Sequence, residues 1–63
     1  MDDVEWERSV HVVESGETMW DIAKIYCPKK VDIRAWIYEV EKMNGIQGYI
    51  YAGDEIVVLE AKK

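Results

Sequence analysis

Apolar and polar positions alternate in two short stretches near the ends of the chain. Residues 9–14 (SVHVVE) and 55–59 (EIVVL) are rich in β-branched side chains and predict two strands. Alternation gives each strand an inner and an outer face, and the expected inner residues are His11, Val13, Ile56 and Val58. The outer face would carry Val10, Val12 and Val57, with Trp6 placed to lie over it. Such an apolar outer face would also suit a dimer or an attached domain.

The stretch after the first strand predicts a short helix. Its apolar residues fall at helical spacing on one face, and they are Met19, Ile22, Ala23 and Tyr26. Thr18 is a suitable N-cap, and Asp21 stands three residues later, where a carboxylate can reach back to the helix start. Pro28 disfavours helix for the residue before it, so the helix should end near Cys27.

A second helix is predicted from Asp32, a plausible N-cap, to Asn44. Its apolar stripe is expected to consist of Ile33, Trp36, Ile37, Val40 and Met43. Gly45 follows as the usual residue at a helix end. The strand–helix–helix–strand order predicts one small α+β domain, in which a two-stranded antiparallel sheet carries both helices on one face. We assign residues 9–60 to this domain, 1–8 to an N-terminal extension and 61–63 to a tail.

Charge and composition narrow the function. The 63 residues carry a net charge of −5, which disfavours nucleic acid and an anionic membrane surface, whereas a neutral or basic ligand is easier to accommodate. Cys27 is the single cysteine and His11 the single histidine, so we expect no disulfide, no metal site and no cofactor. Cys27 reads as a small, half-buried residue at a helix end. No apolar run approaches the roughly 20 residues of a membrane span, and the acidic N-terminus does not resemble a signal peptide.

Two glycine-containing loops are predicted to lie side by side, residues 15–19 before the first helix and residues 44–51 after the second. Gly48 and Gly53 add further turns to the second loop region. Accessible backbone amides together with apolar side chains would form a shallow groove suited to an N-acetylated sugar. Glu17 and Asp54 are the acids in or beside these loops, and a shallow groove on so small a domain cannot enclose the paired carboxylates of a glycosidase. We therefore expect no catalytic residues and no enzyme activity.

The segments HVVESGETMWDIAKIY and MNGIQGYIYAGDEIVVL, in this order, resemble the LysM domain over residues 11–59. This resemblance implies a non-catalytic module that binds N-acetylglucosamine-containing glycans of peptidoglycan or chitin and anchors proteins to the bacterial cell wall. It places the ligand between the two loops, with contact candidates Gly16, Glu17, Thr18, Met19, Asn44, Gly45, Ile46, Gln47 and Ile50. Trp20, off the main helix stripe, is a further candidate for glycan or partner contact.

The sequence also departs from the family pattern. Glu17 stands where Asp is commoner, so the turn is expected to relax, and His11 stands where an aromatic or apolar residue is frequent. The resemblance implies a cell-wall or extracellular location; without a signal peptide, we expect a piece of a longer protein, or an intracellular or phage module. The alternative is a LysM-like interaction or oligomerisation module that has lost glycan binding and uses Val10, Val12 and Val57.

Overall fold

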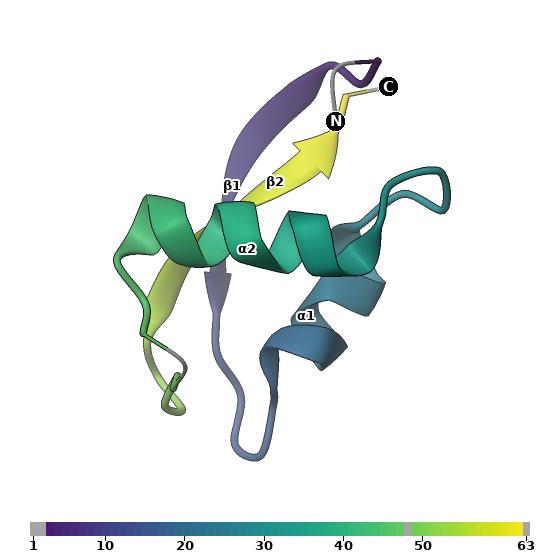
Figure 1. Cartoon of the computed structure of the whole chain (residues 1–63). Coiled ribbons are helices and arrows are strands. Elements are labelled where there is room, and N and C mark those ends of the chain that lie inside the picture. Colours follow the sequence, from purple (N-terminus) through teal and green to yellow (C-terminus); the bar gives the residue numbers. More distant parts are fainter. Residues whose placement is uncertain (1–2, 48, 63) are drawn as a thin grey trace.

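The computed structural model describes residues 3–47 and 49–62, and it has the predicted order of elements (Figure 1). These are β1 (Trp6–Val12), α1 (Met19–Tyr26), α2 (Ile33–Asn44) and β2 (Glu55–Ala61). The predicted α+β class is therefore confirmed. Gly48, and the outermost residues of the predicted extension and tail, lie outside the described residues.

The strands β1 and β2 pair antiparallel, with Trp6 opposite Ala61 and Val12 opposite Glu55. The strand bounds differ from the prediction, because β1 begins at Trp6 and ends at Val12 instead of Glu14, and β2 continues past Leu59 to Ala61. The added residues, 6–8 in β1 and 60–61 in β2, show no clear alternation of apolar and polar side chains. The antiparallel ladder satisfies their backbone groups whatever their side chains. The hydroxyl of Ser9 also donates a hydrogen bond to the Glu60 carboxylate across the pair.

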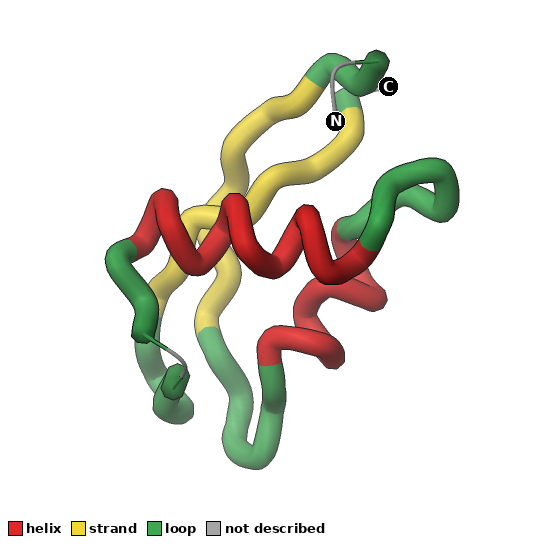
Figure 2. The backbone as a smooth tube through the Cα atoms, viewed as in Figure 1, coloured by secondary structure: helices red, strands yellow, loops and turns green. Residues whose placement is uncertain are grey.

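The two helices contact each other, and both contact β2, so they enclose the core against the sheet (Figure 2). The buried core residues are Val13, Met19, Ile22, Ala23, Trp36, Val40, Ile56 and Val58. The inner faces of the strands and most of the helical stripes are thus confirmed. Met43 is the exception in α2, because it is 37% exposed. Its neighbour Asn44 turns toward β2 instead, as described below.

The outer face of the sheet carries the three predicted valines and is open among the described residues. Val10 is 63% exposed and Val12 54% exposed, while Val57 is half-buried. Trp6 does not cover them: it is half-buried and packs against the hydrophobic core. The expectation that Trp6 lies over the outer face is therefore wrong, and burial of its large apolar ring accounts for the difference.

Candidate functional site

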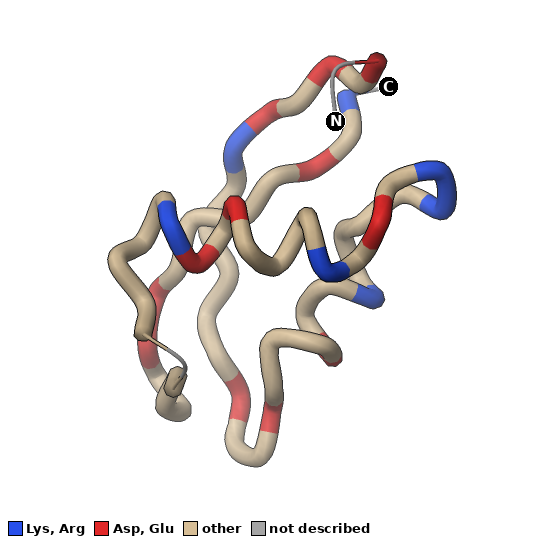
Figure 3. The backbone as a smooth tube through the Cα atoms, in the orientation of Figure 1, with Lys and Arg blue, Asp and Glu red and all other residues tan. Residues whose placement is uncertain are grey.

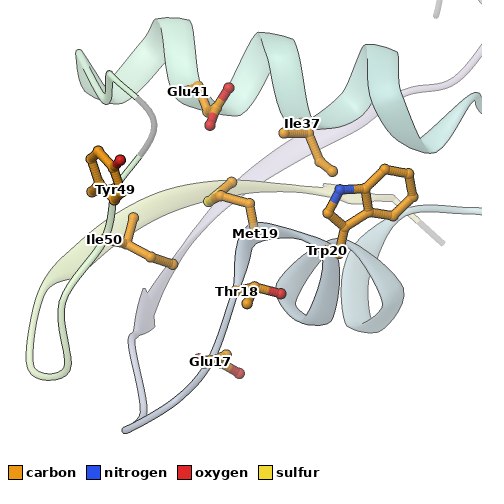
Figure 4. Close-up of a pocket in the computed structure, with 8 residues that line it drawn as sticks. All are labelled: Glu17, Thr18, Met19, Trp20, Ile37, Glu41, Tyr49 and Ile50. Carbon is orange, nitrogen blue, oxygen red and sulfur yellow. The ribbon is translucent and has the colours of Figure 1, made fainter.

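A pocket of about 350 Å³ opens between the two loops (Figure 4). One wall comes from the first loop (residues 15–19) and the start of α1, and the other from α2 and the second loop (residues 44–51). Its lining residues are Glu17, Thr18, Met19, Trp20, Ile37, Glu41, Tyr49 and Ile50. The site is thus assembled from segments that are far apart in the sequence.

The first loop is held by the carboxylate of Glu17. The turn passes through Gly16, whose φ of +79° favours glycine, and the Glu17 N–H donates to the Glu14 carbonyl at 3.1 Å. Oε1 of Glu17 then accepts a hydrogen bond from the Glu14 N–H at 3.0 Å and lies 2.8 Å from Nε2 of His11. The longer Glu17 side chain thus ties the turn to β1 through its carboxylate.

His11 connects this loop to the core. Its Nδ1 lies 2.8 Å from the Tyr26 hydroxyl on α1, and the two rings meet edge to face with centroids 5.5 Å apart. Tyr26 in turn stacks on Trp36 of α2 at 6.4 Å. The hydrogen bond to His11, followed by the one from the Glu14 backbone, lowers the pKa of Glu17. Glu17 is therefore anionic at neutral pH and acts as a hydrogen-bond acceptor.

Thr18 starts α1 as predicted. Its Oγ1 accepts a hydrogen bond from the Asp21 N–H at 3.2 Å, and the Asp21 carboxylate accepts one from the Thr18 N–H at 2.9 Å. This reciprocal pair is a capping box and satisfies two otherwise unpaired backbone donors. Hydrogen bonds from the Thr18 backbone and then its side chain lower the pKa of Asp21. The next residue, Met19, is buried and lines the pocket beside the cap.

The second loop is fixed at both ends. Asn44 accepts from the Val57 N–H at 2.8 Å and donates to the Val57 carbonyl at 2.8 Å and the Val40 carbonyl at 2.7 Å. At the other end, the Val13 N–H donates to the Asp54 carbonyl and the Gly53 N–H to the Val13 carbonyl, both at 2.8 Å. The end of β1 thus contacts the second loop region directly, which keeps the two loops adjacent.

The LysM domain family model matches residues 11–59, most of the chain. The chain belongs to the LysM domain family. Domains of this family are in general glycan-binding modules rather than catalytic ones. Neither the search of curated proteins nor the search of solved structures found a significant match.

The LysM pocket brings together four of the nine residues predicted as contacts, namely Glu17, Thr18, Met19 and Ile50. The other five do not line it, and they are Gly16, Asn44, Gly45, Ile46 and Gln47. Of these, Asn44 bonds to β2, Ile46 packs against the core, and Gln47 is exposed.

The pocket also contains residues that sequence reasoning placed elsewhere or passed over. Trp20 was only an additional candidate, and its 49% exposure leaves its ring accessible. Tyr49 is 80% exposed. The sequence offered a signal for it, because an aromatic residue within the predicted second loop is a candidate for contact with a sugar. Ile37 and Glu41 come from α2, and only the crossing of this helix over the loops brings them to the pocket.

The walls of this LysM pocket combine apolar and aromatic side chains with two carboxylates, Glu17 and Glu41. Within residues 3–47 and 49–62, no group of three His, Cys, Asp or Glu residues is suited to hold a metal ion. No helix in the same residues has the length and apolarity needed to cross a membrane.

Proposed function

We propose that this domain is a non-catalytic module that binds N-acetylglucosamine-containing glycans of peptidoglycan or chitin. The observation that carries the proposal is the pocket between the two loops, where apolar and aromatic side chains stand beside polar ones. From the predicted contacts we retain Glu17, Thr18, Met19 and Ile50 as side-chain contacts, and we add Trp20 and Tyr49. We expect no side-chain contact with the ligand from the remaining predicted residues, which do not line the pocket, namely Gly16, Asn44, Gly45, Ile46 and Gln47.

The composition of the walls suits the two faces of such a sugar. Aromatic rings such as those of Trp20 and Tyr49 can cover the apolar face of a pyranose, and Met19 with Ile50 can receive the acetyl methyl group. An open pocket buries little of the ligand. We therefore expect micromolar to millimolar dissociation constants, on the order of −4 to −8 kcal/mol.

The test is a titration of the domain with chitin oligomers while backbone amide resonances are recorded. We expect shifts for residues 15–19, 44–47 and 49–51, and none for residues 27–33. Trp20→Ala should weaken binding, whereas Tyr38→Ala removes a similarly exposed aromatic ring of α2 outside the pocket and should not. Shifts confined to one loop, or equal losses in the two variants, would contradict a site between the loops.

Retention on a cell wall is part of the same proposal. The domain should sediment with insoluble peptidoglycan and be displaced by soluble oligomers of N-acetylglucosamine. It should release no reducing ends from this material during the incubation. Sedimentation that soluble oligomers do not reverse would point to contacts other than the pocket.

The exposed valines favour a second candidate, an interaction module whose outer sheet face meets a second copy or an attached domain. Val10 and Val12 are more than half exposed, although both are strongly apolar. A Val10→Thr, Val12→Thr double variant should then lower the apparent mass in sedimentation equilibrium and leave glycan binding unchanged. A monomeric wild-type domain would rule out self-association through this face.

A further inference from the structure

Glu41 stands on the pocket wall without a partner among the described residues. Its carboxylate makes no ion pair or side-chain hydrogen bond to any residue in 3–47 or 49–62. Glu41 is nevertheless only partly exposed, and it points from α2 toward the space beside Met19 and Tyr49 (Figure 4). A partly desolvated anion without a counter-charge is available to a cationic ligand.

The position of Glu41 in α2 makes this anion unfavourable for the helix itself. The helix ends at Asn44, so Glu41 lies in its last turn, where the helix dipole favours cations over anions. Lys42 in the same turn follows that preference. Glu41 is thus electrostatically unfavourable for α2, and such a residue beside a pocket indicates a role in binding.

The other anion of the pocket, Glu17, differs from Glu41. Its charge is already shared with the Glu14 N–H and with His11. Neither Lys nor Arg appears among the described residues that line the pocket. Figure 3 shows acidic positions at the first loop, and basic positions in the connection between α1 and α2 and along α2. The pocket is therefore negative, and the uncompensated part of its charge lies at Glu41.

Aromatic rings complete a site for an ammonium group. Trp20 and Tyr49 line the same pocket as Glu41, and both rings are accessible. An alkylammonium ion is attracted electrostatically both by the face of an aromatic ring and by a carboxylate. A neutral N-acetyl group carries no positive charge and lacks both of these attractions. The same walls thus distinguish a glycan that carries a free amine from one that is fully acetylated.

We propose that the pocket prefers glycans bearing a protonated primary amine next to N-acetylated sugar, and that Glu41 is the residue that sets this preference. This inference rests on the proposed glycan binding, and it specifies which chemical class of glycan the pocket binds most tightly. The amine can belong to a de-N-acetylated sugar unit or to a lysine-type side chain of an attached peptide, because both present the same ammonium group.

The experiment measures dissociation constants for three tetrasaccharides at low salt. These are fully N-acetylated chitotetraose, the same tetramer with one de-N-acetylated unit, and the N-acetylated tetramer linked to a short lysine peptide. We expect at least one amine-bearing ligand to bind roughly three- to fivefold tighter than chitotetraose, the upper range for a solvent-accessible ion pair. Raising the ionic strength should shrink this difference through screening. The ligand that shows the difference identifies the source of the amine.

Glu41→Gln should remove the preference, so that the amine-bearing ligands bind no tighter than chitotetraose does. Its thermal midpoint should not fall, because the substitution removes an anion from the last turn of α2. Glu39→Gln is the matched control, since it removes the same charge from the same helix outside the pocket and should keep the preference.

The outcomes separate this inference from the function on which it rests. Binding of chitotetraose without any amine preference, or equal effects of the two glutamine variants, would overturn the role of Glu41 and leave glycan binding intact. Failure to bind any of the three ligands would overturn both.

Discussion

Replacement of Asn44 by alanine tests whether this side chain serves the fold or the ligand. The resemblance to LysM domains made Asn44 a contact candidate, whereas its carboxamide makes three hydrogen bonds, one to Val40 and two to Val57. Because both backbone groups of Val57 point to Asn44, this carboxamide occupies the place of a neighbouring strand at the edge of β2. It fastens the end of α2 to the sheet.

The expected cost follows from these three bonds. Each contributes about 1 kcal/mol net, and a backbone group left without a partner costs more where water cannot replace the bond. Asn44 is half-buried, so water can recover part of the loss. We therefore expect Asn44→Ala to lower the free energy of unfolding by about 2–3 kcal/mol. A domain of this length has roughly 3–9 kcal/mol in total, and the midpoint of thermal unfolding should fall by about 10–20 °C.

The assay combines thermal unfolding, followed by near-ultraviolet circular dichroism, with glycan affinity per folded molecule at a temperature where the variant is folded. Gln47→Ala is the control, because Gln47 is exposed just beyond the same helix end, and its stability should stay within about 0.5 kcal/mol of wild type. Affinity per folded molecule should be retained in Asn44→Ala. Unchanged stability with lost affinity would refute the structural role and restore Asn44 as a ligand contact.

Three further outcomes are expected. Thr18→Ala should cost about 1 kcal/mol through loss of the cap and should also weaken glycan binding, which amide titration can check; full affinity would make the first loop a cap only. Gly45→Ala should cost about 1 kcal/mol because φ is +66° there, yet affinity per folded molecule should be kept, since the added Cβ would meet nothing within 4 Å and lies outside the pocket lining. The lowered pKa values of Glu17 and Asp21 add stability that is complete above the ordinary carboxyl values of 4.5 and 3.8 and is lost as the pH falls through the lowered ones. Denaturant titrations between neutral and acidic pH should show this loss, and Glu17→Gln should reduce it; an unchanged acid profile in that variant would contradict the role of Glu17.

The helices were predictable because their signals are local. Thr18 and Asp32 precede apolar periodic stretches, and Gly45 follows one, so caps and stripes agree with each other. The ends of the strands were less predictable. β1 begins at Trp6 because pairing with β2 continues through polar residues, and nothing in the local pattern of β1 reveals where its partner stops.

The site was predictable in its loops and not in its helical wall. Glu17, Thr18, Met19 and Ile50 belong to segments whose adjacency follows from the order of the elements. Glu41 instead reaches the pocket because of the angle at which α2 crosses the loops and its rotation about its own axis. Packing between elements sets both, so the sequence of the helix alone does not predict them.

Two departures from the family pattern, His11 and Glu17, become one feature in the structure. Glutamate has one methylene more than the commoner aspartate, and its Oε1 contacts both the Glu14 N–H and Nε2 of His11. An apolar residue at position 11 would offer no donor to this carboxylate, and a shorter side chain at position 17 would have less reach toward it. The pair fixes the first loop through Tyr26 to the core before any ligand arrives. Because an ordered loop loses less conformational entropy on binding, the same contacts that stabilise the turn should favour the affinity of the pocket that it lines.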